Sequence, residues 1–268
     1  MRFGPAGYPP EGKNPIGSLE YTKSLGLDAL EVEFVRGARI SEERAATIGE
    51  AAKKLGIRLS CHAPYFVSFN SESQETREKS VGWVMDTARA AHHLGAYIIV
   101  IHAASYGKSP ETALDSVIEG LTVCRDNLDN EGIDVILGVE TMGKSGQFGT
   151  LDEIEKVMES VDVRPVLDVA HVHARGGGFL KTEDDMRKLT DRFFELSGDR
   201  PHFHISCIEY GPKGEKNHLP LEAKDPDMQL LANVLSDSDR DCTFICESPR
   251  ISADAVVFRD MFPRYRRN

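Results

Sequence analysis

The sequence lacks long apolar runs and has few cysteines. No apolar stretch approaches the ~20 residues that a membrane-spanning helix needs, and the start of the chain lacks the apolar segment of a signal peptide. The five cysteines are odd in number and scattered, a pattern typical of reduced thiols. We therefore expect a cytoplasmic protein that is neither secreted nor embedded in a membrane.

The sequence also lacks an excess of positive charge. Its 43 acidic residues outnumber 32 lysines and arginines and give a formal net charge of −11. A generic nucleic-acid binder usually carries a basic surface, so this balance argues against that class. A cluster of bound divalent cations would change the local field whatever the formal total.

Short apolar runs typical of β-strands alternate with amphipathic helical stretches along the chain. The eight expected strands are residues 2–6, 29–35, 58–61, 97–101, 135–139, 165–169, 202–206 and 243–246. The expected helices are 17–25, 41–55, 73–94, 110–130, 151–160, 182–196, 227–235 and 252–261. This alternation predicts parallel strands joined by crossover helices.

Eight such units in 268 residues favour a single (β/α)8 TIM-barrel domain over residues 1–268. A doubly wound open sheet is the alternative, but no Gly-x-Gly-x-x-Gly motif follows the first strand. Residues 209–227 are rich in Gly, Pro, Lys and Glu, and we expect them to form a long loop after the seventh strand. Long loops after barrel strands lie on the catalytic face.

Residue types that bind metals recur at the ends of six consecutive expected strands. They are His62, His102, Glu140, Asp168, His204 and Glu247, with His171 three residues beyond Asp168. In a barrel these strand ends meet on one face, where catalytic residues gather. Imidazoles and carboxylates without cysteine suit zinc, manganese or iron. The alternative is a polar network at the mouth of the barrel.

The number of these residues exceeds what one ion needs. Two or three ions bridged by a carboxylate would use them all, and Glu140, near the middle of the series, is the natural bridge. Clustered ions ~3.5–4 Å apart are suited to binding a phosphoryl group and hydrolysing its ester. The pattern therefore indicates phosphoryl chemistry.

Several segments resemble the endonuclease IV family of zinc-dependent apurinic/apyrimidinic endonucleases, which are TIM barrels. The similar segments are Cys61-His62-Ala63-Pro64-Tyr65, Ile101-His102-Ala103-Ala104-Ser105, Val139-Glu140-Thr141, Leu167-Asp168-Val169-Ala170-His171, the region around His204, Asn217-His218-Leu219-Pro220-Leu221 and Cys246-Glu247-Ser248-Pro249. The resemblance spans nearly the whole chain, and the motif that contains His171 is its most specific part.

The resemblance implies an enzyme that hydrolyses the phosphodiester 5′ to abasic sites in duplex DNA, and it implies DNA repair. It implies two or three Zn²⁺ ions, with Mn²⁺ as an alternative, and a catalytic role for Glu140. One ion would bind His62, His102 and Glu140, and a second would bind Glu140, Asp168, His204 and Glu247. A third would bind His171 and His218. Abasic duplex DNA would be the partner, and the sequence indicates no protein partner.

Two further residues are candidates for contacts with DNA. Tyr65 follows the first histidine ligand on a loop, where an aromatic ring could wedge into a distorted duplex. Arg36 follows the second expected strand and is a candidate phosphate contact. The alternatives are packing at the rim for Tyr65 and a solvated loop position for Arg36.

The sequence departs from the family at the third ion. The family has an aspartate two residues before the counterpart of His218, and this chain has Lys216 there. A protonated lysine cannot bind a metal; Glu215, one residue earlier, could substitute if the loop is shifted. Ala103-Ala104 also replaces the family's Pro-Gly. Sugar and sugar-phosphate isomerases and epimerases share this barrel and several of these ligands, so they are the alternative function.

Overall fold

The computed structural model describes residues 1–266. These residues divide into two compact units. The first unit contains residues 1–30, 143–145 and 166–266, and the second contains residues 31–142 and 146–165. Among residues 1–266, no helix combines the length and apolar composition needed to cross a lipid bilayer.

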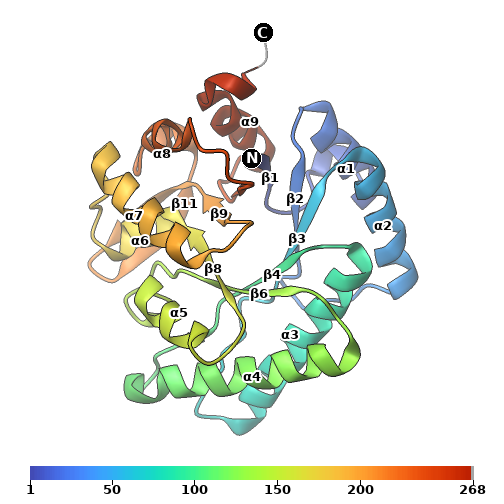
Figure 1. Cartoon of the computed structure of the whole chain (residues 1–268), viewed down its shortest axis with the longest axis vertical. Helices are drawn as coiled ribbons and strands as arrows, with labels where there is room; N and C mark the ends of the chain where they lie inside the picture. The colour runs from blue at the N-terminus through green and yellow to red at the C-terminus, as the bar shows by residue number, and fades with distance from the viewer. Residues whose placement is uncertain (267–268) are drawn as a thin grey trace. The chain divides into compact units, whose positions relative to one another are not determined.

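The first unit contains parallel strands in the order β1-β12-β9-β8. Their bounds are Arg2–Pro5 (β1), Thr243–Cys246 (β12), His202–Ile205 (β9) and Arg164–Asp168 (β8). Its helices are α1 (Pro15–Ser24), α6 (Val169–Arg175), α7 (Glu183–Leu196), α8 (Met228–Leu235) and α9 (Ile251–Met261). Helices α7 and α8 lie side by side (Figure 1). An antiparallel hairpin of β10 (Cys207–Gly211) and β11 (Gly214–Leu219) follows β9.

Aromatic rings build much of the core of the first unit. The ring centroid of Phe244 on β12 lies 5.4 Å from that of Phe3 on β1 and 4.8 Å from that of Phe203 on β9. All three side chains are buried. Burying an aromatic side chain of this size contributes roughly 1.5–3 kcal/mol. These rings pack β1, β12 and β9 against one another, and His204 lies within β9 while Glu247 directly follows β12.

The second unit contains parallel strands in the order β6-β4-β3-β2. Their bounds are Ile136–Glu140 (β6), Ile98–Ile101 (β4), Arg58–His62 (β3) and Ala29–Glu33 (β2). Its helices are α2 (Glu42–Leu55), α3 (Gln74–Leu94), α4 (Ala113–Glu131) and α5 (Leu151–Met158), and α3 lies beside α4 (Figure 1). A short antiparallel pair joins β5 (Ala104–Ser105) and β7 (Gln147–Phe148). Short 3-10 helices occupy Pro10–Gly12, Pro110–Thr112, Leu221–Ala223 and Pro263–Tyr265 in the two units.

Serine side chains cap the first turns of α2 and α3, and glycines end both helices. The side chain of Ser41 accepts a hydrogen bond at the start of α2, and Ser73 does the same for α3. Both helices end at a glycine with positive φ, Gly56 at 67° and Gly95 at 68°. Glycine adopts this left-handed conformation at little cost because it has no Cβ. The expected helices over 41–55 and 73–94 stop directly before these two glycines, and these ends are confirmed.

All eight expected strands are observed, with ends that shift by no more than a few residues. The prediction of a long loop over 209–227 was wrong, because residues 207–219 form the β10–β11 hairpin. Its tight turn uses Gly214 at a φ of +88°, so the glycine and proline that suggested a loop mark a hairpin turn. Helix α6, which is not among the helices expected from the sequence, begins directly after Asp168.

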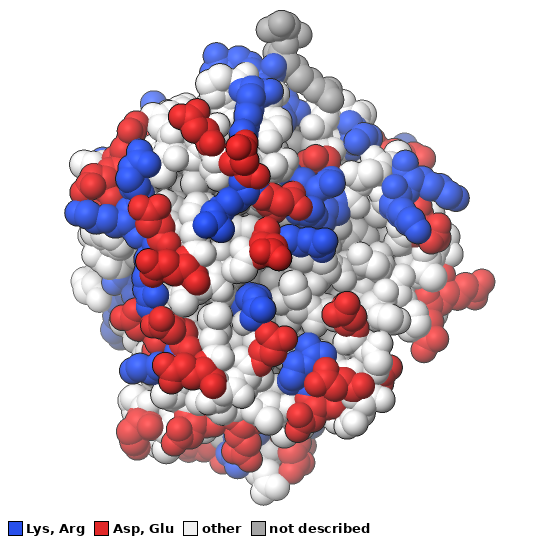
Figure 2. All heavy atoms as spheres, viewed as in Figure 1, with Lys and Arg blue, Asp and Glu red and all other residues white. Residues whose placement is uncertain are grey.

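The surface charge is uneven. In Figure 2 acidic side chains gather over α4 and α3, at the bottom of the view. Exposed residues of α4 include Asp115, Glu119, Asp126 and Asp129. A polyanion such as DNA would be repelled by this face, so we do not expect it to form a nucleic-acid contact.

Candidate metal centres

Three predicted ligands lie at the ends of neighbouring parallel strands in the second unit. His62 is the last residue of β3, His102 directly follows β4, and Glu140 is the last residue of β6. Strand β4 pairs with both β3 and β6, so the ends of the three strands lie at the same edge. His62 and Glu140 are buried, and His102 is partly buried. We call these three residues the His62 cluster.

Both imidazole rings point their Nε2 atoms at one carboxylate oxygen. The Oε2 atom of Glu140 lies 3.2 Å from Nε2 of His62 and 2.7 Å from Nε2 of His102. The Nδ1 atom of His62 lies 2.6 Å from the carbonyl oxygen of Ala63. Since a carbonyl can only accept, Nδ1 carries the proton in that hydrogen bond. A proton held at Nδ1 leaves the lone pair of Nε2 available to a cation.

Negative charge dominates the surroundings of His62. Burial alone lowers the pKa of this imidazole. The charge of Glu33, the hydrogen bond and charge of Glu140, and the charge of Glu31 act in the opposite direction and raise the pKa of His62 to about 10. A site that favours a proton this strongly also favours a metal cation in its place.

Tyr65 covers this cluster from a loop. Its ring centroid lies 4.9 Å from that of His62 and 5.2 Å from that of His102. Its hydroxyl donates a hydrogen bond of 3.1 Å to Oε2 of Glu33, and 48% of the residue is exposed. Arg36 is exposed in the turn after β2. Tyr65 therefore presents an accessible aromatic face beside the cluster, while the roles of Tyr65 and Arg36 in binding DNA remain predictions.

The first unit carries a second group of predicted ligands. Asp168, His171 and His218 offer ligand atoms that lie within 4.8 Å of one another. The Oδ1 atom of Asp168 accepts the backbone N–H of His171 at 2.6 Å and so caps helix α6. The rings of His171 and His218 lie 5.2 Å apart between centroids. We call these three residues the His171 cluster.

Two more predicted ligands lie near Asp168 in the same unit. Asp168, His204 and Glu247 offer ligand atoms within 4.8 Å of one another. Oε1 of Glu247 lies 3.3 Å from Nδ1 of His204, and its Oε2 lies 3.9 Å from Nε2 of His218. The chain thus brings each of the eight predicted ligands into one of these groups, whereas their function as metal ligands is an inference from this arrangement.

Sequence reasoning missed two residues that support the clusters. The hydroxyl of Ser206 lies 2.6 Å from Nδ1 of His218, and Glu33 holds the hydroxyl of Tyr65. A serine or a glutamate in a strand gives no local signal of such a contact. His173, which the sequence did not place among the ligands, is buried in α6 with Nε2 2.9 Å from Oδ1 of Asp225, a structural contact.

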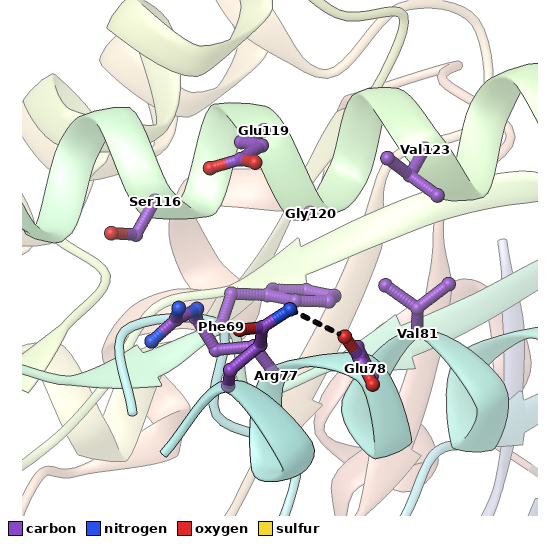
Figure 3. A pocket seen from close by; sticks show the side chains of 9 residues that line it. Phe69, Arg77, Glu78, Val81, Ser116, Glu119, Gly120 and Val123 are labelled. Carbon is purple, nitrogen blue, oxygen red and sulfur yellow. Dashed lines mark hydrogen bonds between the residues drawn. The ribbon is translucent and has the colours of Figure 1, made fainter. Parts of the chain in front are cut away.

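A cavity of about 330 Å³ between α3 and α4 contains none of the predicted ligands (Figure 3). It is lined by Phe69, Arg77, Glu78, Val81, Gly120 and Val123, among others. No imidazole lines it, and its two carboxylates, Glu78 and Glu119, come from α3 and α4. The candidate metal centres therefore lie at the strand ends and not in this cavity.

The donor atoms of the clusters fit a divalent metal. They are imidazole nitrogens and carboxylate oxygens, buried or nearly so, which is the donor set of zinc and manganese sites. All five cysteines are buried and free, and none belongs to a cluster.

Sequence comparison identifies related chains. A family model described as a xylose isomerase-like TIM barrel matches residues 19–261. The uncharacterized protein MJ0133 of Methanocaldococcus jannaschii is 31% identical over 260 residues, which are 95% of this chain and 94% of that protein. A probable endonuclease 4 of Aquifex aeolicus is 26% identical over 236 residues, covering 77% of this chain and 83% of that protein.

Solved structures share the fold. Endonuclease IV from Thermus thermophilus superposes with a TM-score of 0.75 at 23% identity, covering 98% of this chain and all of that one. A D-tagatose 3-epimerase-like protein superposes with a TM-score of 0.73 at 17% identity, covering 99% and 97%. The (β/α)8 barrel expected from the sequence is thereby confirmed.

Proposed function

Because the chain belongs to the xylose isomerase-like TIM-barrel family, we propose that it is a metal-dependent hydrolase that cleaves the phosphodiester 5′ to abasic sites in duplex DNA. Relatives named probable endonuclease 4 support this activity over others in the family. The proposal includes Zn²⁺, with Mn²⁺ as the alternative, and a role in base-excision repair in the cytoplasm. A single domain over residues 1–268 stays a prediction.

The observation that carries the proposal is that each unit has its own cluster of metal-type ligands. The His62 cluster has two imidazoles on one carboxylate, and the His171 cluster has two imidazoles and a carboxylate. A reaction that needs one ion would leave one of these clusters without use. Divalent ions, when bound together, neutralise the phosphate charge and activate water for attack on phosphorus.

Contacts with Glu140 and with the carbonyl of Ala63 orient the imidazole rings of the His62 cluster. Glu140 holds the two Nε2 atoms of His62 and His102 toward one point through its Oε2 atom. The Ala63 carbonyl keeps the proton of His62 on Nδ1 and fixes the orientation of the ring. A buried carboxylate and buried rings exclude bulk water, which strengthens the electrostatic interactions with a phosphate.

Substrate contacts are proposed for the loop residues. The exposed ring of Tyr65 lies against both imidazoles of the His62 cluster, where it can pack against a sugar that lacks its base. Arg36 is proposed to contact a backbone phosphate, because an exposed guanidinium can donate two hydrogen bonds to it. These contacts would position the scissile bond beside the cluster.

The test is cleavage of an abasic duplex by the metal-replete protein, with and without a chelator. We expect cleavage that the chelator abolishes. The Glu140→Gln variant should lose activity by at least about 100-fold, since it keeps the size of the side chain and removes its charge. Glu119→Gln, on the exposed face of α4, is the matched control and should cleave normally. Absence of cleavage by the metal-replete wild type refutes the proposed activity.

The second candidate is a metal-dependent isomerase or epimerase of sugars or sugar phosphates. The fold shared with a D-tagatose 3-epimerase-like protein and the net charge of −11 favour it. Such an enzyme typically needs one ion per chain. Counting bound metal by mass spectrometry therefore separates the two candidates: two or three ions per chain support the nuclease and one ion supports the isomerase.

A further inference from the structure

The position that the family resemblance assigns to a metal ligand is occupied by Lys216, yet the structure brings another carboxylate, that of Glu215, beside His171. In a regular strand, side chains alternate between the two faces, so residue 216 would share a face with His218 and Glu215 would not. Strand β11 is not regular at this point. The register between β10 and β11 shifts between Glu209 and Tyr210, which pair with Asn217 and Glu215.

Lys216 is therefore the extra residue of a β-bulge. An inserted residue offsets the alternation by one, so that Glu215 and His218, three positions apart, face the same side. The Nζ atom of Lys216 lies 3.0 Å from Oε1 of Glu209, and about half of the Lys216 side chain is exposed. The lysine is thus bound to a neighbouring strand at the surface and does not enter the cluster.

Glu215 lies beside His171. Its Oε2 atom is 3.5 Å from Nε2 of His171, and only 13% of its side chain is exposed. Its backbone N–H donates a 3.0 Å hydrogen bond to the carbonyl of Gly143. The Oε1 atom lies 4.0 Å from Nζ of Lys144, which offsets part of the negative charge at the rim.

Gly143 provides the space for this arrangement. A Cβ at residue 143 would lie 2.7 Å from Cβ of Glu215, 2.8 Å from its Oε2 and 3.0 Å from Cδ2 of His171. Contacts below 3.0 Å are not tolerated without movement of the backbone or of both side chains. The glycine is therefore needed for Glu215 and His171 to approach each other.

Hydrogen bonds also hold His218 and His171 of the His171 cluster in place. Ser206 holds Nδ1 of His218 at 2.6 Å, which leaves Nε2 of that ring for a ligand. Asp168 fixes the backbone of His171 through the cap of α6. We propose that Glu215, brought in by the bulge at Lys216, is a ligand of the divalent ion bound by His171 and His218. This inference rests on the proposed metal dependence and adds a ligand to it.

The experiment counts metal in purified protein dialysed against Zn²⁺, using mass spectrometry, and records the visible absorption of the Co²⁺-loaded form. Glu215→Gln should lose one ion per chain, or bind it at least about tenfold more weakly. It should also change the Co²⁺ spectrum. Lys216→Gln is the matched control and should retain the wild-type ion count, because Lys216 lies outside the cluster.

A double variant decides which residue occupies the ligand position. Glu215→Gln combined with Lys216→Asp puts an aspartate two residues before His218, but the bulge directs that side chain away. We therefore expect the double variant to remain deficient in one ion. Recovery of the ion would overturn the inference, as would a full ion count in Glu215→Gln or a wild type without an ion at this cluster. Gly143→Ala should also lose one bound ion per chain, because its Cβ would displace Glu215. Circular dichroism verifies that each variant folds.

The readout separates this inference from the proposed activity. A wild type that binds the ion through Glu215 but does not cleave abasic DNA would refute the activity and leave the ligand assignment intact. Cleavage of DNA by a Glu215→Gln variant with all its ions would refute the ligand assignment alone.

Discussion

Removal of bound metal with a chelator is expected to leave His62 as an imidazolium ion at neutral pH. Burial opposes this charge, but the carboxylates of Glu33, Glu140 and Glu31 outweigh it and raise the pKa of His62 to about 10, against an ordinary value of 6.5. The difference corresponds to about 5 kcal/mol at 1.36 kcal/mol per pH unit, as an order of magnitude. In the metal-free protein His62 should therefore be charged across the physiological range.

The sign of the effect on stability follows from linkage. A pKa raised on folding means that the folded state holds the proton more tightly than the unfolded state. The contribution of His62 to the free energy of unfolding is fully present below pH 6.5. It is lost progressively as the pH rises through about 10. The contribution of His62 should thus make the metal-free protein less stable at pH 10 than at pH 7.

The same proton competes with a metal ion. Between pH 7 and about pH 10, binding of Zn²⁺ to the His62 cluster should release one proton from His62, so the apparent affinity should rise by up to about tenfold per pH unit. Glu140→Gln removes a hydrogen bond and a charge that raise this pKa, so the variant should titrate at lower pH than the wild type.

The assay is an NMR titration of isotope-labelled histidine in the chelated protein. His173 serves as an internal control, because burial lowers the pKa of this ring despite its contact with Asp225. At pH 7 the spectrum should contain a charged His62 and a neutral His173. A neutral His62 in the metal-free protein at pH 7 would refute the reasoning that carboxylates dominate this cluster.

Two further predictions concern stability in the chelated protein, measured by urea unfolding. Asp168→Ala should be less stable than Asp168→Asn by about 1 kcal/mol, because asparagine can still cap α6 through the N–H of His171 and alanine cannot; equal stabilities would contradict the capping role. Gly49→Ala should lose about 1–3 kcal/mol, since its Cβ would lie 2.5 Å from the carbonyl oxygen of Leu94, whereas Gly82→Ala in α3 meets nothing within 4 Å and should gain about 0.5–1 kcal/mol. A loss in both glycine variants would argue against the packing explanation.

The helices and strands could be predicted well because the signals that define them lie within each segment of the sequence. Alternating apolar strands and amphipathic helices repeat eight times, and serine caps and terminal glycines mark helix ends such as those of α2 and α3. The hairpin at residues 207–219 was missed because its turn residues are equally typical of a long loop. Only the pairing of β10 with β11 distinguishes the two.

The sequence by itself determined the fold class and the residue types at the strand ends. Parallel strands in a barrel must deliver their last residues to one face, so the sequence predicts from their positions that His62, His102 and Glu140 lie together. Their convergence on a single carboxylate oxygen, at 3.2 Å and 2.7 Å, came only from the structure. Interatomic distances depend on strand register and side-chain rotamers, which sequence spacing does not specify.

Only the tertiary structure shows which carboxylate lies beside His171. By sequence spacing, Lys216 occupies the ligand position and Glu215 the opposite face. One inserted residue in β11 reverses that assignment, and Gly143, about seventy residues away in the chain, makes the space for the result. A bulge is defined by how two strands pair, and the fit of Glu215 depends on a third segment. The residue pattern of one strand shows neither how that strand pairs nor which distant segment it contacts.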